Sequence, residues 1–334
     1  MFTKMYVFLR VSASRLIMSA VAVTLSASWT IADPLDEAIQ SRNDLEKSRD
    51  VYRHPKETLV FFDVQPGMTV VETLPGRGWY SKILVPYLGP SGHFIAANYP
   101  LDLAAKVFGE RWDSMRERLE GWPQTFPVWA STLSVDPPKI ATYYITQAPL
   151  SLAGSVDRIL FIRSLHHLNR FDPQMLDHAA EESFRLLKPG GIVGVVQHRA
   201  PSANSEQWAD GSNGYLRTSR VVAAFESAGL KLAEESQLNA NPNDVPTESD
   251  RVWRLPPTLR TENDEERQHS INVGESDRKC QIILQNGNGG PTPDATRQTC
   301  RKRRRRWAGT RPTTSPYRGV ITNIASVAGQ SPSA

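Results

Sequence analysis

The chain has 334 residues, 40% of them hydrophobic, and a formal net charge of +4. This content suits one domain of about 200–250 residues with appendages better than two equal domains. The charge is uneven: residues 286–334 hold nine Arg and Lys against one Asp, residues 1–32 hold three basic residues and no acid, and residues 33–285 therefore carry a net −7. The basic character belongs to the two ends, so whole-chain charge does not indicate a specific nucleic-acid partner.

Residues 1–32 are typical of a secretory signal peptide. Three basic residues precede an apolar run over residues 16–25, and a region of small residues ends at Ala32. The run is shorter than the ~20 residues that a membrane helix needs. We expect cleavage after Ala32, a periplasmic or secreted protein, and no stable membrane insertion after cleavage; an uncleaved N-terminal anchor is the alternative.

The other end of the chain changes character near Gln285. Residues 286–334 are rich in Gly, Pro, Ser and Thr and contain an arginine run that could bind anions non-specifically. We expect a basic disordered tail here, which leaves residues 33–285 as the folded domain. Cys280 and Cys300 permit one bridge, but no CxxC pattern for a redox or zinc site is present in the sequence.

The domain begins with helical segments. Asp33-Pro34 is a helix start, and a polar helix is expected from there to about Arg49. A short apolar helix follows over residues 59–62. Arg53 and His54 precede the first glycine-rich turn by ~20 residues, so they either fold over the mouth of that turn or cap a helix.

The next element is a buried strand at Thr69–Val71, which ends at Glu72, turns through Gly76 and Gly78 and opens a helix that stops at Gly89. The glycines let a ligand approach the backbone N–H groups at the start of the helix. A dinucleotide site would have a third glycine three residues after the second, where this chain has a serine.

Further strands and helices alternate along the chain. Strands are expected at residues 93–98, near residues 126–130, and at residues 156–162 and 192–196. The alternation predicts an α/β fold with a doubly wound, mostly parallel sheet. Ligands in such sheets lie beyond the carboxyl ends of the strands, where His166, His167 and His198 follow the last two of these strands.

The last part of the domain contains a helix at residues 218–228 and a strand at residues 230–238. A proline-containing loop over residues 239–260 follows, which is able to act as a lid. Residues 279–284 are expected to form a final antiparallel strand.

Residues 70–78 resemble motif I of the class I S-adenosylmethionine-dependent methyltransferases, with Leu74 in place of the first glycine. Residues 186–191, which lead into a strand, resemble a later landmark of that family. The chain is also similar to a bacterial subfamily of exported predicted methyltransferases over about residues 40–279. The similarity is carried by five short segments, at residues 53–55, 75–80, 198–200, 239–242 and 253–257.

The resemblance implies a seven-stranded, Rossmann-like methyltransferase fold and S-adenosylmethionine as cofactor. By similarity, Glu72 and the backbone of Pro75, Gly76 and Gly78 hold the methionine part of the cofactor. Asn98 stands where the family has an acid for the ribose hydroxyls, and an amide can also hydrogen-bond a diol. Gln197 stands where the subfamily is expected to have an acid.

The predicted function is methyl transfer from S-adenosylmethionine to a small molecule. Methyl transfer often needs a base, for which His198 is the first candidate and His166 and His167 are the others. No metal is expected in this reaction. Two alternatives stay open: an exported ligand-binding module that kept the fold without the reaction, and a metal-dependent hydrolase that uses the three histidines.

Overall fold

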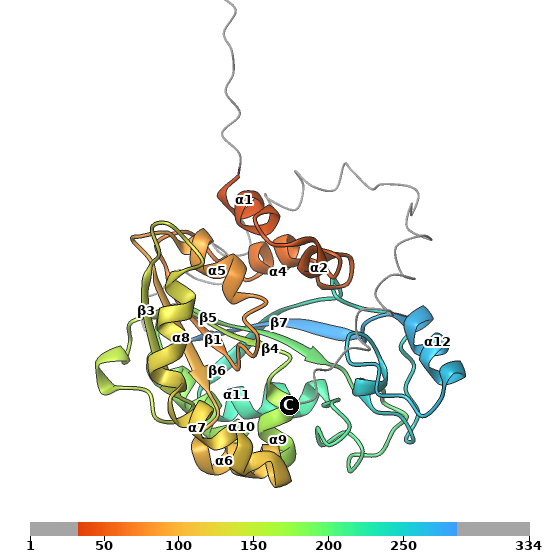
Figure 1. The fold of residues 1–334 in the computed structure, drawn as a ribbon. Helices are drawn as coiled ribbons and strands as arrows, with labels where there is room; N and C mark the ends of the chain where they lie inside the picture. Colours follow the sequence, from red (N-terminus) through yellow and green to blue (C-terminus); the bar gives the residue numbers. More distant parts are fainter. Residues whose placement is uncertain (1–32, 286–334) are drawn as a thin grey trace, which may run out of the picture. The chain divides into compact units, whose positions relative to one another are not determined.

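The computed structural model describes residues 33–285, so the predicted signal peptide, the basic tail and Cys300 lie outside the described residues. A seven-stranded sheet in the order β3-β2-β1-β4-β5-β7-β6 is covered by helices on both faces (Figure 1). The last strand, β7, runs antiparallel to both of its neighbours, and the other strand pairs are parallel. The predicted seven-stranded, mostly parallel fold is confirmed.

The strands are β1 (Thr69–Thr73), β2 (His93–Asn98), β3 (Lys139–Tyr144), β4 (Val156–Ile162), β5 (Leu187–His198), β6 (Leu230–Ser236) and β7 (Arg278–Gln285). The α-helices are α1 (Pro34–Gln40), α2 (Asp44–Lys47), α3 (Asp50–Arg53), α4 (Pro55–Phe61), α5 (Ser81–Leu88), α6 (Leu101–Phe108), α7 (Trp112–Glu120), α8 (Trp122–Ser131), α9 (Leu165–Phe171), α10 (Pro173–Leu186), α11 (Thr218–Ser227) and α12 (Asp264–Val273). Short 3-10 helices are η1 (Gly109–Arg111), η2 (Leu150–Leu152) and η3 (Val252–Arg254).

The sheet has a core on each face because successive strand side chains point to opposite sides. Val70 and Phe94 pack in one core with helices α1, α4, α5 and α8. Val71 and Ile95 pack in the other with α9, α10 and α11. Figure 1 shows α1, α4 and α5 on one side of the sheet and α9, α10 and α11 on the other. Burial on both faces explains why the strands contain continuous apolar runs.

The strand predicted near residues 126–130 is wrong. This segment belongs to α8, where Trp122, Phe126 and Trp129 recur at helical spacing and line the buried side. The aromatic and β-branched content suggested a strand, but the helical period of the apolar residues decided the structure. The third strand is β3, whose Ile140 and Tyr143 come after the double proline at 137–138.

The polar helix predicted from Asp33 to about Arg49 is interrupted. Asp33 caps α1 as expected, accepting a hydrogen bond of 3.0 Å from the Leu35 N–H. The helix ends at Gln40, and Asn43 caps the separate helix α2. Within residues 33–285, none of the helices is both long enough and apolar enough to traverse a bilayer.

Candidate functional site

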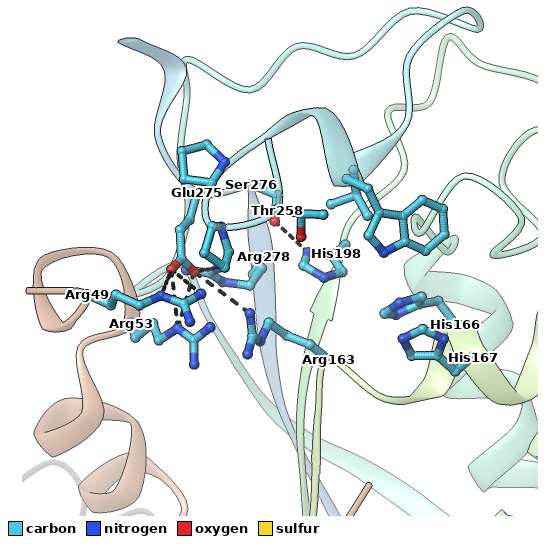
Figure 2. A pocket seen from close by; sticks show the side chains of 14 residues that line it. Arg49, Arg53, Arg163, His166, His167, His198, Thr258, Glu275, Ser276 and Arg278 are labelled. Atoms are coloured by element: carbon cyan, nitrogen blue, oxygen red, sulfur yellow. Dashed lines mark hydrogen bonds and ion pairs between the residues drawn. The ribbon is translucent and has the colours of Figure 1, made fainter. Parts of the chain in front are cut away.

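A pocket of about 230 Å³ lies where the carboxyl ends of β4 and β5 meet the N-terminal helices and the loop after β6 (Figure 2). Its lining has two chemically distinct parts. Three histidines, His166, His167 and His198, lie at one end together with Trp253. At the other end Figure 2 shows four guanidinium groups gathered around the carboxylate of Glu275. The pocket therefore offers imidazoles and a cationic surface to one ligand.

The structure brings the three predicted histidines together. His166 and His167 belong to the first turn of α9, which begins after β4, and His198 is the last residue of β5. The ring centroid of His166 lies 4.1 Å from that of His167 and 5.1 Å from that of His198. Parallel pairing aligns the ends of β4 and β5, because Ile162 lies opposite Val196, and this alignment explains the meeting.

Each histidine has a different hydrogen-bonding environment. The Nδ1 atom of His166 lies 3.4 Å from Oε1 of Gln197, the residue that stands in place of the expected acid. The Nδ1 atom of His198 shares a short hydrogen bond with the hydroxyl of Ser276. The Nδ1 atom of His167 is buried and has no hydrogen-bond partner among residues 33–285. His167 is therefore the imidazole that keeps this nitrogen available.

Burial keeps all three imidazoles neutral. It lowers the pKa of His166 and of His198 well below the ordinary value, and the neighbouring histidines and arginines lower both further. Burial, with Arg170 and Arg163, lowers the pKa of His167 to about 4. At neutral pH each ring is thus unprotonated and able to accept a proton.

The arginine cluster, defined as Arg49, Arg53, Arg163 and Arg278, surrounds Glu275. The carboxylate oxygens of Glu275 lie 2.6 Å from Nη2 of Arg49, 3.3 Å from Nε of Arg53, 2.8 Å from Nη1 of Arg278 and 3.9 Å from Nη1 of Arg163. Four cations against one carboxylate leave a formal +3 at this end of the pocket. The guanidinium of Arg53 also lies 4.4 Å from the centroid of the Trp79 ring, a cation–π contact.

The loop over residues 239–260 is fixed against the histidine end. Buried Asp244 accepts a hydrogen bond of 2.9 Å from the Tyr215 hydroxyl and pairs with Arg254 at 3.1 Å. This network positions Trp253, whose ring centroid lies 6.2 Å from that of His166. The loop predicted as a lid therefore covers the pocket in this structure.

The predicted cofactor residues lie at the ends of β1 and β2, next to the pocket but outside its lining. Leu74, in place of the first glycine of the motif, adopts φ +49°, the left-handed conformation that a glycine would favour. Gly76 has φ +59° and open space where a side chain would stand. The backbone at Gly76 is thus accessible to a ligand, as the motif requires.

Gly78 has a packing role that the sequence did not reveal. A Cβ atom at this position would lie 2.1 Å from the Trp129 ring of α8, so the glycine is required for packing inside the protein. Its residue position is buried, whereas Gly76 is exposed. The cofactor contact expected of the Gly78 backbone stays a prediction.

Glu72 and Asn98 are both engaged with the protein itself. The buried carboxylate of Glu72 accepts a hydrogen bond of 2.6 Å from the Ser81 hydroxyl, and burial raises its pKa to about 7. Oδ1 of Asn98 accepts from the N–H of Tyr99 at 2.9 Å, at the half-buried end of β2. Pro75 is buried within the turn.

Sequence reasoning missed three of the four arginines, Arg49, Arg163 and Arg278, and the acid of the cluster. Arg163 follows β4 directly, next to the histidine pair, so its position beyond a strand end was the available signal. Glu275 precedes β7 and is 222 residues from Arg53, a separation that no local pattern reveals. Among residues 33–285, no three His, Cys, Asp or Glu side chains are grouped so that they could hold a metal ion.

No family model and no curated protein matches the chain. Solved structures with a similar fold include S-adenosylmethionine-dependent methyltransferases. One, from Aquifex aeolicus, is 15% identical with a TM-score of 0.43, covering 75% of this chain and 98% of its own. A chain of the complex between the Haloferax volcanii Trm112 methyltransferase activator and a methyltransferase is 18% identical with a TM-score of 0.45, covering 77% and 100%. The [4+2]-cyclase SpnF is 14% identical with a TM-score of 0.44, covering 76% and 92%.

Proposed function

We propose that the protein is an S-adenosylmethionine-dependent methyltransferase whose acceptor is a small molecule bound in the pocket. One contact carries the proposal: the hydroxyls of Thr73 and Ser164 lie 3.0 Å apart, both buried. Thr73 ends the strand that leads into the glycine turn, and Ser164 precedes the histidine pair. The contact therefore joins the segment that resembles a cofactor loop to the segment that lines the pocket, and it supports a donor site beside an acceptor site.

The residues present fit the cofactor at part of the predicted site. The exposed backbone of Gly76 and the amide of Asn98 would hold it, with Glu72 beneath the turn and Pro75 shaping it. When bound, the cofactor supplies an electrophilic methyl group. Trp253 and the histidines line the space beside this turn and reduce the water that reaches a reacting acceptor.

His198 is the proposed base, since its ring is neutral and Ser276 fixes its orientation through Nδ1. The test is to incubate the purified protein with methyl-labelled cofactor and a mixture of small metabolites and to follow the label into a product. We expect His198→Ala to lower turnover by about 10²–10⁴-fold while cofactor affinity changes little. Lost cofactor binding with unchanged turnover at saturating cofactor would place His198 in the cofactor site instead.

The alternative is an exported binding module without the reaction. The lowered pKa of His198 favours it, because burial and the neighbouring Arg278 and Arg163 make this imidazole a weak base at neutral pH when no anion is bound. Cofactor binding without label transfer to any tested acceptor would support this alternative. The N-terminal sequence pattern supports a periplasmic or secreted location for either function, and a mature N-terminus at Met1 in a secreting host would contradict it.

A further inference from the structure

At the arginine end of the pocket, two buried donor atoms have no hydrogen-bond partner in the part of the chain that the structure describes. Arg53 is 3% exposed and lines the pocket, and its Nε atom contacts Glu275. Its Nη1 and Nη2 atoms are buried and make no hydrogen bond within residues 33–285. Buried donors are nearly always satisfied, and leaving a charged one unsatisfied is costly. Two such nitrogens on a pocket wall indicate a missing acceptor.

Arg163 is presented to the same pocket by an unusual backbone. It has φ +57° directly after β4, and its N–H donates to the Val196 carbonyl at 2.6 Å. This conformation is strained in a residue other than glycine and is found most often where a ligand or a catalytic group must be held. The nearest carboxylate oxygen, on Glu275, is 3.9 Å away, so Arg163 has only a loose ion pair.

We propose that the arginine cluster binds an anionic group of the acceptor, a carboxylate or a phosphate, with Arg53 and Arg163 as its principal donors. Guanidinium groups match the geometry of both anions and bind them through paired hydrogen bonds. Glu275 holds the cluster in place, and one further anion reduces its formal +3. The acceptor's role rests on the proposed function, whereas anion binding itself does not.

The same pocket links the anion to the proposed base. After burial, Arg278 and Arg163 are the largest influences that lower the pKa of His198. A bound anion offsets these cations, so it raises the pKa of His198 and makes the imidazole a stronger base only when the acceptor is present. The groups that face His198 are Arg53, Arg163, Arg278, His166, His167, Tyr215 and Ser276.

The test is calorimetric titration of the full chain with inorganic phosphate and with succinate, against chloride at matched ionic strength. We expect at least one probe to bind, with about tenfold or greater weakening in Arg53→Gln and in Arg163→Gln. Arg220→Gln is the matched control, because Arg220 pairs with Asp177 away from the pocket, at 2.8 Å. If neither probe binds, or if all three variants bind alike, the anion site is wrong.

Further measurements distinguish an anion site for the acceptor from a site for the cofactor's carboxylate, and from failure of the proposed function. If Arg53→Gln fails to fold, Arg163→Gln and Arg53→Lys serve in its place, the latter keeping the charge but losing the paired donors. Titration of probe with saturating S-adenosylhomocysteine present should give unchanged affinity; displacement would assign the cluster to the cofactor's own carboxylate and overturn the acceptor role. Arginine-dependent probe binding by a protein that binds no cofactor would uphold the anion site and reject the proposed function.

Discussion

At the scale of single residues, Glu275 is the side chain whose substitution we expect to destabilise the protein most, because four arginines surround its carboxylate. Burial raises its pKa, but the attraction of the arginine cluster outweighs burial and holds the pKa well below its ordinary value. Its stabilising contribution is therefore complete above the unfolded pKa of about 4.3 and is lost only as the pH falls below that value toward the folded pKa.

Glu275→Gln should lower the free energy of unfolding at pH 7 by about 3–5 kcal/mol, since it leaves four arginines without their carboxylate. Urea denaturation measures this, with Glu226→Gln, an exposed position in α11, as control. The control should change stability by less than about 0.5 kcal/mol. A Glu275→Gln protein as stable as the parent would show that the cluster does not depend on its acid.

Glu72 should respond to pH in the opposite sense. Its pKa is raised to about 7 by burial, although the Ser81 hydroxyl favours the ionised form. The stabilising contribution of Glu72 is therefore fully present below about pH 4.3 and is lost as the pH rises through about 7, by up to roughly 3 kcal/mol. Melting of Glu72→Gln at pH 5 and pH 8 checks this. The melting temperature of Glu72→Gln, relative to that of the parent, should be higher at pH 8 than at pH 5. The same difference between variant and parent at both pH values would refute the raised pKa of Glu72.

At the scale of elements, the turn between β1 and α5 contains two glycines whose surroundings differ. Gly78→Ala should lose about 1–3 kcal/mol to overpacking against Trp129, in addition to the cost of its φ of +72°. Gly76→Ala has open space and should lose only about 1–2 kcal/mol from its backbone conformation. Thermal melting compares them. The part of the Gly78→Ala loss that comes from overpacking should disappear when Trp129→Ala is combined with it. Equal stability losses in Gly78→Ala and Gly76→Ala, without this rescue, would contradict the packing role of Gly78.

The sequence patterns predicted the elements whose apolar residues recur with a clear helical or strand period. They failed where the residue types favoured a strand but their spacing was helical. Strands β1, β2, β4 and β5 were predicted, because a glycine-containing turn precedes the apolar run of each, whereas β3 was placed in the wrong segment. In α8, strand-forming residue types occupy helical positions, so composition and spacing disagreed. Helix α12 was not predicted, because its polar sequence buries little beyond Ser270 and Val273.

For the candidate site, sequence reasoning reached the groups that follow strand ends. The three histidines were identified because parallel strands bring their carboxyl ends to one edge. Arg53, at the end of α3, was identified only as a residue close in sequence to the glycine turn. The Glu275 contacts were not, because they join the first and last parts of the domain through tertiary packing. The packing of Gly78 against Trp129 was not predicted for the same reason, as Trp129 lies 51 positions further along the chain.

At the scale of the whole molecule, β7 decides where the domain can be shortened. It lies between β5 and β6 and pairs with both. A chain that ends at Gln285 should melt at the temperature of the parent, because the sheet is complete and residues 286–334 have little apolar content to bury. A chain that ends at Asp277 should not fold. A large drop in melting temperature for the first truncation would show that the tail contributes to stability.

Cofactor binding concerns the molecule as a whole. The turn after β1 and the pocket after β4 form one active site only if S-adenosylmethionine binds at the turn. Isothermal titration of the parent with S-adenosylmethionine measures it directly, with Gly76→Val as the variant that fills the open space at the turn. We expect one saturable site in the parent, loss of binding in the folded Gly76→Val protein, and retained binding in His198→Ala. Absence of binding heat in the parent, or equal affinity in Gly76→Val, would contradict a cofactor site at this turn.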